Sequence, residues 1–103
     1  MSGTALTEAV YYILLSLTKP MHGYGVMQNV EQLSNGRVKL AAGTLYGAIN
    51  TLLEKGRITA IPGEKDSRKK EYQITETGRQ ALEGEILRLR ELIENGNRIL
   101  EGK

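Results

Sequence analysis

Gly43-Thr-Leu-Tyr-Gly-Ala-Ile-Asn-Thr-Leu-Leu-Glu-Lys-Gly56 is a stretch whose periodicity predicts a helix with two unlike faces. Its apolar residues recur at helical spacing and form one stripe suited to a core: Leu45, Ile49, Leu52 and Leu53. The other face carries small or hydrogen-bonding side chains without the lysines and glutamates usual on a solvated helix: Thr44, Tyr46, Gly47, Asn50 and Thr51. Such a face suits close approach to another polymer, and Gly56 is a typical helix-ending residue.

The overall composition limits the classes of protein that are compatible with this helix. The chain has 103 residues, which is enough for one small domain with a modest core. It has no cysteine, a single histidine, no glycine-rich phosphate loop and no metal-ligand spacing, so we expect neither an enzyme nor a cofactor. No signal peptide is recognisable, and no apolar run approaches the ~20 residues of a membrane span. We therefore expect a cytoplasmic protein without a membrane partner.

The net charge of +2 is unevenly distributed along the chain. Residues 1–70 hold nine Lys and Arg against five Asp and Glu, whereas residues 71–103 hold five against seven. The cations concentrate in the stretch from Lys65 to Lys70. The first part of the chain is therefore the part suited to a polyanion.

Two helices are predicted before the helix at residues 43–56. The first spans Thr4 to Leu17, with Thr4 as its N-cap and Lys19-Pro20 as its stop. The second spans His22 to Leu33, and its first turn contains glycines that allow another backbone to come near. After the helix at residues 43–56, Arg57–Ile61 and Glu71–Ile74 have the alternation of two β-strands joined by a polar, basic loop, which predicts a hairpin.

The last segment, from Thr75 almost to the end, is predicted to be one long helix with a heptad seam formed by Leu82, Ile86, Leu89, Ile93 and Leu100. About 25 helical residues extend ~37 Å, which exceeds what a domain of this size can cover. A second copy of the chain is the simplest partner for such a face, so the seam predicts a homodimer.

This order of elements is that of a winged helix-turn-helix domain, residues 1–75, followed by a dimerisation helix, residues 76–103. The fold class expected is thus mainly α with a small β-hairpin. Four motifs resemble the PadR family of bacterial transcriptional regulators, in its compact subgroup: His22-Gly-Tyr24, Gly43-Thr-Leu-Tyr46, Leu53-Glu-Lys-Gly56, and Lys70-x-Tyr72-x-Ile74-Thr75-x-x-Gly78. The resemblance covers roughly residues 6–80. It implies a homodimeric, usually repressing regulator that reads a near-palindromic operator and can be released from it by a small molecule.

Two positions depart from the family pattern. The family commonly has an acidic residue at Gly25 and a proline at Gly47. A glycine at position 47 costs the helix ~1 kcal/mol relative to Ala, yet it leaves room for a sugar-phosphate backbone or a base edge. Contacts near Gly47 therefore do not transfer directly from relatives.

The roles of individual residues in DNA binding follow from chemistry. The start of the second helix of a helix-turn-helix reaches base edges, which assigns Thr44, Tyr46, Gly47 and Asn50 to the recognition surface. Phosphate contacts are expected from side chains at the start of the preceding helix and on the wing: His22, Tyr24, Lys65, Arg68, Lys69 and Lys70. Each has a plainer alternative, since Tyr46 could be a half-buried core residue and the basic run a solvated loop.

An effector pocket is expected at the dimer interface between the first and last helices, lined by Tyr11, Tyr12, Leu15, Leu89 and Ile93. A closed dimer interface without a ligand is the alternative. A further class also stays open, namely a winged-helix adaptor that binds protein and lacks specific DNA binding. The operator, the regulated genes and the choice between repression and activation do not follow from the sequence.

Overall fold

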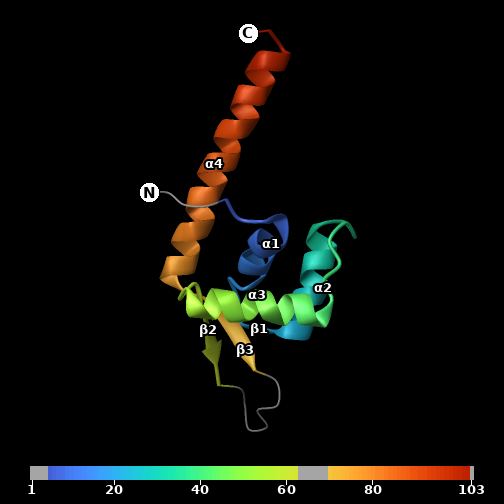
Figure 1. Ribbon diagram of the computed structural model, residues 1–103, viewed down its shortest axis with the longest axis vertical. Helices are drawn as coiled ribbons and strands as arrows, with labels where there is room; N and C mark the ends of the chain where they lie inside the picture. Colours follow the sequence, from blue (N-terminus) through green and yellow to red (C-terminus); the bar gives the residue numbers. More distant parts are fainter. Residues whose placement is uncertain (1–4, 63–69, 103) are drawn as a thin grey trace.

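The computed structural model describes residues 5–62 and 70–102 of the chain (Figure 1). Its elements follow in the order α1 Glu8–Ser16, β1 Met21–His22, α2 Gly23–Leu33, α3 Ala42–Glu54, β2 Ile58–Ile61, β3 Glu71–Ile74 and α4 Glu76–Leu100. The expected fold class, mainly helical with a small antiparallel sheet, is confirmed. The helix expected at residues 43–56 spans Ala42–Glu54. The helix expected from Thr75 onward spans Glu76–Leu100.

The sheet has three strands in the order β1-β3-β2, so the expectation of a two-stranded hairpin was incomplete. Strands β2 and β3 pair antiparallel with Ile58 opposite Ile74 and Ala60 opposite Tyr72. The additional strand, β1, places Met21 opposite Tyr72 on the other side of β3. Two residues are too short to produce a period-two pattern, and only the approach of β3 provides hydrogen-bonding partners for them.

The first two helices begin later than expected, and each is preceded by a residue whose side chain caps it. Helix α1 starts at Glu8 because the Thr7 hydroxyl accepts a hydrogen bond from the N–H of Val10, 3.1 Å away. The expected cap, Thr4, lies outside the described residues and four positions before the helix. Helix α2 starts at Gly23, since His22 is extended and its Nδ1 accepts from the N–H of Gly25 at 3.2 Å.

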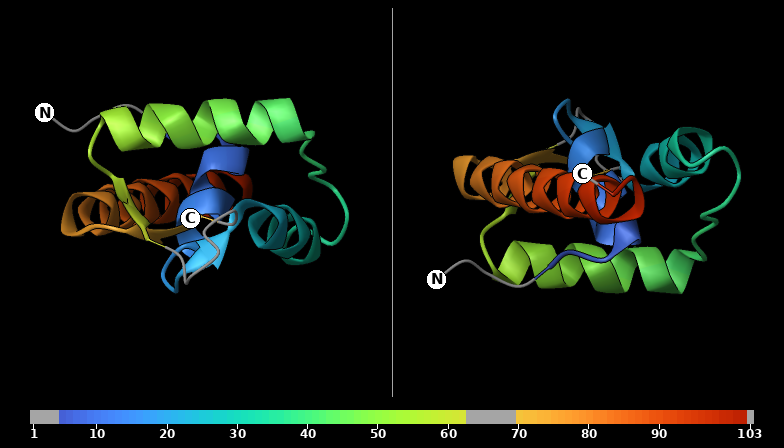
Figure 2. Two further views of the ribbon diagram at one scale, coloured as in Figure 1. Left: turned by 90° about the horizontal axis from the view of Figure 1, so that it is seen from below. Right: turned by 90° about the horizontal axis from the view of Figure 1, so that it is seen from above.

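The core surrounds α1, which Figure 2 shows enclosed by α2, α3 and α4. This explains why α1 is apolar over more than one stripe. Every element except β1 contributes a buried side chain: Ile13, Leu14, Leu17, Val26, Val30, Leu45, Ile49, Leu52, Ile58, Tyr72 and Leu82. A buried polar link joins the first two helices, because Asn29 donates to the Ser16 hydroxyl at 2.8 Å and Ser16 donates to the Tyr12 carbonyl at 2.8 Å.

Helix α4 is attached to this body at its start and extends away from it (Figure 1). The hydroxyl of Thr75 accepts from the N–H of Gly78 and donates to the Gly56 carbonyl, at 3.1 and 2.7 Å. The buried residues of α4 all lie in its first half: Gly78, Leu82 and Glu85. From residue 90 to residue 102 every side chain is exposed. No helix in the described part of the chain is long and apolar enough to cross a membrane.

Candidate nucleic-acid interface

Helix α3 presents one buried and one open face. Its core side chains Leu45, Ile49 and Leu52 are at most 2% exposed, as their spacing predicted. The residues assigned to base reading on the other side, Thr44, Gly47 and Asn50, are exposed. A Cβ atom built on Gly43 or Gly47 would meet no atom within 4 Å, so the surface around both glycines is open space. Between Gly43 and Thr51 the helix therefore offers a surface of uncharged side chains to a second molecule.

Tyr46 lies at the edge of this surface and is 43% exposed. Its hydroxyl end packs against Gly23, where even a methyl group would collide with the ring. The lack of a side chain on Gly23 thus brings the start of α2 directly against α3. Burial, with a smaller contribution from nearby Tyr46, raises the pKa of Tyr72 above its ordinary value. Tyr46 consequently combines a packing role with an exposed edge.

The residues assigned to phosphate contacts at the start of α2 differ in accessibility. His22 is half-buried, and one of its two ring nitrogens, Nδ1, accepts the capping hydrogen bond from the N–H of Gly25. Tyr24 is 63% exposed and immediately follows the glycine that contacts Tyr46. The start of α2 and the open face of α3 therefore border each other, as expected for a helix-turn-helix.

Strands β2 and β3, which form the wing, lie at the same end of the molecule as α3, opposite the C-terminus (Figure 1). Lys70 is exposed and directly precedes β3. The other three cations assigned to the wing lie outside the described residues: Lys65, Arg68 and Lys69. Helix α3 and the strands β2 and β3 thus lie at one end, while α4 extends toward the other.

Residues 12–84 of this sequence match the model of the family described as "Transcriptional regulator PadR-like family". The chain belongs to the PadR-like family. Its fold is the winged-helix fold of a solved PadR-family regulator.

The chain is also similar to individual proteins. The chain is 38% identical over 79 residues to an uncharacterized 37.1 kDa protein in transposon TN4556 of Streptomyces fradiae, a match of 76% of this chain but 22% of that protein. It therefore spans about a fifth of the length of this curated relative. Among solved structures, it is similar to a PadR family transcriptional regulator from Eggerthella lenta, with a TM-score of 0.73 and 23% identity over 91% of this chain and 82% of that one. It is also similar in fold to BpsR of Bordetella bronchiseptica, whose DNA binding is regulated by 6-hydroxynicotinic acid, with a TM-score of 0.68 and 20% identity over 95% and 69% of the two chains.

The heptad seam of this PadR-family chain is divided between the core and the surface. Leu82 is 5% exposed and packs in the core of its own chain, so it is not part of the free face of α4. Ile86 and Leu89 lie at the margin, and Ile93 and Leu100 are 62% and 87% exposed. Periodicity could not separate these roles, because a heptad repeats identically whether the facing helix comes from the same chain or from another.

The residues expected to line an effector pocket are spread over two environments. Tyr11, Tyr12 and Leu15 are partly buried against the core, and the two tyrosine rings meet edge to face with centroids 5.9 Å apart. Leu89 is half-buried and Ile93 is exposed further along α4. A pocket with a partly apolar lining lies elsewhere, between α1 and the C-terminal half of α3. Sequence reasoning missed it because its walls come from segments far apart in the chain.

Proposed function

We propose that this PadR-family regulator is a sequence-specific repressor that binds double-stranded DNA as a homodimer. The observation that carries the proposal is the open, uncharged face of α3 around Gly43 and Gly47. Exposed helices normally carry charged side chains, whereas a helix that enters the major groove needs small and hydrogen-bonding ones. The neighbouring start of α2 and the basic wing supply contacts to phosphates on either side.

Asn50 and Thr44 are the residues we assign to base readout. Both are exposed on α3, and an asparagine side chain can donate to and accept from adenine at the same time. Gly47 lies between them and provides the close approach that a bulkier residue would prevent. Tyr24 and the wing cations, including Lys70, would hold the backbone and set the register without selecting a sequence.

Dimerisation is assigned to the exposed half of α4. Four large apolar side chains there are more than half exposed: Leu92, Ile93, Ile99 and Leu100. Burying each one fully is worth about 1.5–3 kcal/mol, so a matching helix from a second copy would be held firmly. A two-fold axis through this contact would orient the two α3 helices oppositely, which requires an inverted-repeat operator with half-sites ~34 Å apart or a multiple of it.

Release by a small molecule completes the proposal. The similarity in fold to BpsR, whose DNA binding is regulated by 6-hydroxynicotinic acid, supports a ligand-controlled regulator. A ligand that binds more tightly to a dimer with a different spacing of the two α3 helices would lower the affinity of the protein for the operator.

Selection of binders from a random duplex pool tests the proposed function. We expect enrichment of an inverted repeat by the wild-type chain. Asn50→Ala should relax the preference at one or two base pairs in each half-site, at a cost of ~1–3 kcal/mol, whereas the control Lys70→Ala should leave the preferred sequence unchanged. An asymmetric motif, or no enrichment, would instead favour a winged-helix adaptor that binds protein.

The salt dependence of binding tests the wing separately. Replacing Lys69 and Lys70 by Ala should weaken binding to all duplexes to a similar extent. Each lost phosphate contact should lower the slope of log K against log salt concentration by ~0.9. An unchanged slope would assign these lysines to a solvated loop.

A further inference from the structure

We propose that the pocket between α1 and α3 binds a small amphipathic monoanion, such as a medium-chain carboxylate. The pocket has a volume of about 260 Å³, just below the range of ~300–1,000 Å³ typical of drug-sized sites. It therefore suits a molecule smaller than most drugs. Its apolar wall is formed by Leu6 before α1, Val10 in α1, and Ala48 and Leu52 in α3.

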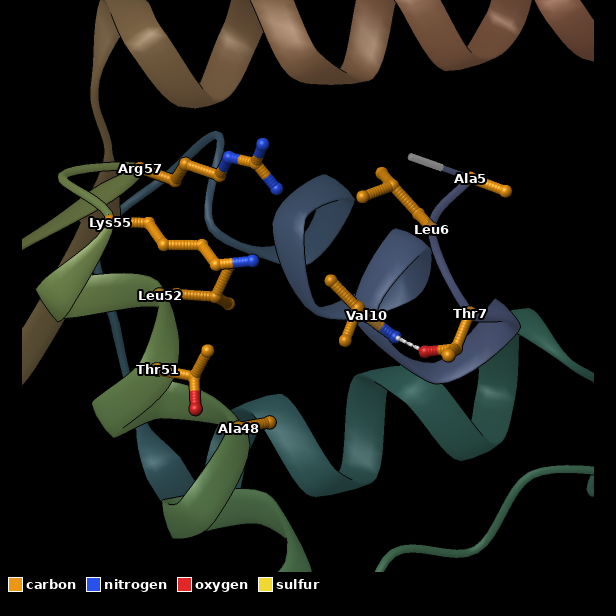
Figure 3. Close-up of a pocket in the computed structure, with 9 residues that line it drawn as sticks. All are labelled: Ala5, Leu6, Thr7, Val10, Ala48, Thr51, Leu52, Lys55 and Arg57. Atoms are coloured by element: carbon orange, nitrogen blue, oxygen red, sulfur yellow. Dashed lines mark hydrogen bonds between the residues drawn. The ribbon is translucent and has the colours of Figure 1, made fainter. Parts of the chain in front are cut away.

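Two cations supply the complementary end of the pocket. Lys55 and Arg57 follow α3, and Figure 3 shows both side chains extending from that side across the gap toward Leu6 and Val10. No acidic side chain is among the described walls, and neither cation pairs with a carboxylate in the part of the chain that the structure describes. An apolar recess with two convergent positive charges matches a ligand with a hydrocarbon body and one negative group.

The backbone of Arg57 is held in place by α3 and by the start of α4. Its N–H donates to the Leu52 carbonyl at 2.9 Å, and its carbonyl accepts from the N–H of Thr75 at 3.0 Å. The same carbonyl lies against Gly78 in the first turn of α4. The cationic end is therefore mounted on the junction of α3, β2 and α4, and is not carried by a free loop.

The pocket also lies next to the surface that we assign to DNA reading and to the first half of α4, which packs on the body. Thr51 lines it, and its hydroxyl donates to the carbonyl of Gly47 at 3.2 Å, within the open face of α3. Leu6 lines the other side, and the pKa of Glu85 in α4 is lowered mainly by Arg88 and, to a smaller extent, by the backbone amide of Leu6. A ligand that displaces Thr51 or Leu6 would thus act on α3 and α4 together. This regulatory consequence, unlike the binding site itself, rests on the proposed function.

The test uses octanoate, with 1-octanol and octylamine as ligands of the same chain length that carry a neutral or a positive head. Amide NMR spectra of the full chain without DNA would report binding, so this measurement does not depend on operator recognition. We expect octanoate to shift the signals of Leu6, Val10, Thr51 and Leu52, and to bind more tightly than the other two probes. Equal affinity for all three probes, or shifts confined to residues 90–102, would overturn the site.

Variants separate the charged end from the apolar wall. The double change Lys55→Gln and Arg57→Gln should weaken octanoate binding about ten-fold, because two ion pairs are lost. The matched control Lys19→Gln and Arg79→Gln removes two cations outside the pocket and should bind as the wild type does. Ala48→Leu should block binding by filling the recess while leaving both cations in place. If neither the double change nor Ala48→Leu weakens binding, the site is wrong.

The regulatory consequence is measured by DNA affinity with and without octanoate. We expect a lowered affinity in the wild type and no change in the Lys55→Gln, Arg57→Gln variant. Octanoate binding in the pocket without an effect on DNA affinity would refute the coupling while leaving the site intact. A chain that binds octanoate but no duplex at all would refute the proposed function alone.

Discussion

Replacing Gly78 by Ala should destabilise the fold, although Ala is the better helix former. Gly78 is buried in the first turn of α4, where a Cβ atom would collide with the carbonyl oxygen of Arg57 and lie 2.7 Å from Cγ1 of Ile74. The Arg57 carbonyl cannot retreat freely, because it accepts the hydrogen bond from the N–H of Thr75 at 3.0 Å. The new methyl group must therefore push α4 away from the β2 junction.

The expected magnitude combines opposing terms. A Gly-to-Ala change in a helix gains about 1 kcal/mol, while inserting a methyl group into a packed site costs about 1–3 kcal/mol. Weakening the hydrogen bond between Thr75 and Arg57 adds about 1 kcal/mol of cost. Because the obstacle is backbone and not the end of a flexible side chain, the upper part of the packing range applies. A net loss of about 2 kcal/mol would lower Tm by roughly 8–16 °C in a domain of this size.

Urea unfolding followed by circular dichroism measures this difference, at one protein concentration because dimerisation would affect the apparent stability. Gly84→Ala is the matched control, since Gly84 is an exposed glycine of the same helix with no neighbouring atom within 4 Å of a Cβ. It should be more stable than the wild type by about 0.5–1 kcal/mol. If Gly78→Ala is as stable as Gly84→Ala, the inferred contact with Arg57 does not limit the packing of α4.

Three other substitutions test separate features. Gly47→Ala should raise the free energy of unfolding by about 1 kcal/mol, because the site is open, yet weaken DNA binding measured by fluorescence anisotropy; equal affinity would remove Gly47 from the interface. Ile93→Asp should give a folded monomer in sedimentation experiments, since Ile93 is 62% exposed in the single chain; a persistent dimer would exclude this face of α4. Hydrogen bonds from Arg88 at 2.8 and 2.7 Å, followed by a smaller effect of the Leu6 amide, lower the pKa of Glu85 below its ordinary 4.5. The ionised Glu85 therefore stabilises the folded state above about pH 4.5, and this stabilisation is lost as the pH falls through the lower pKa of the folded state. Glu85→Gln should lose less stability on acidification than the wild type. An unchanged dependence of stability on pH in the acidic range would contradict this prediction.

The local sequence pattern was sufficient to predict the elements that are long or that begin at a capping residue. The buried face of α3 followed from the spacing of Leu45, Ile49 and Leu52, and each of them is buried. The start of α4 followed from Thr75, whose hydroxyl caps the helix at Gly78. These features depend on interactions within one or two turns of chain, so a single sequence contains them.

The assignment of residues to recognition and effector binding could be predicted only in part. Sequence placed Thr44 and Asn50 on the side of α3 that the structure leaves exposed. Their contact with DNA remains a prediction, as does the division of the chain at residue 75. The effector pocket predicted at the dimer interface also remains a prediction: in the single chain Ile93 is exposed on the extended part of α4, while Tyr11 and Tyr12 pack against the core.

Features that join distant segments were decided by tertiary structure. β1 exists because β3 pairs with Met21, and Leu82 is a core residue because α4 packs against the body in its first half. The fit of Tyr46 over Gly23 and the meeting of Leu6, Lys55 and Arg57 around one pocket likewise bring together residues from separate segments of the chain. Helical periodicity and capping are properties of neighbours in sequence, whereas a pairing strand, a divided seam and a pocket depend on which segments meet when the core closes.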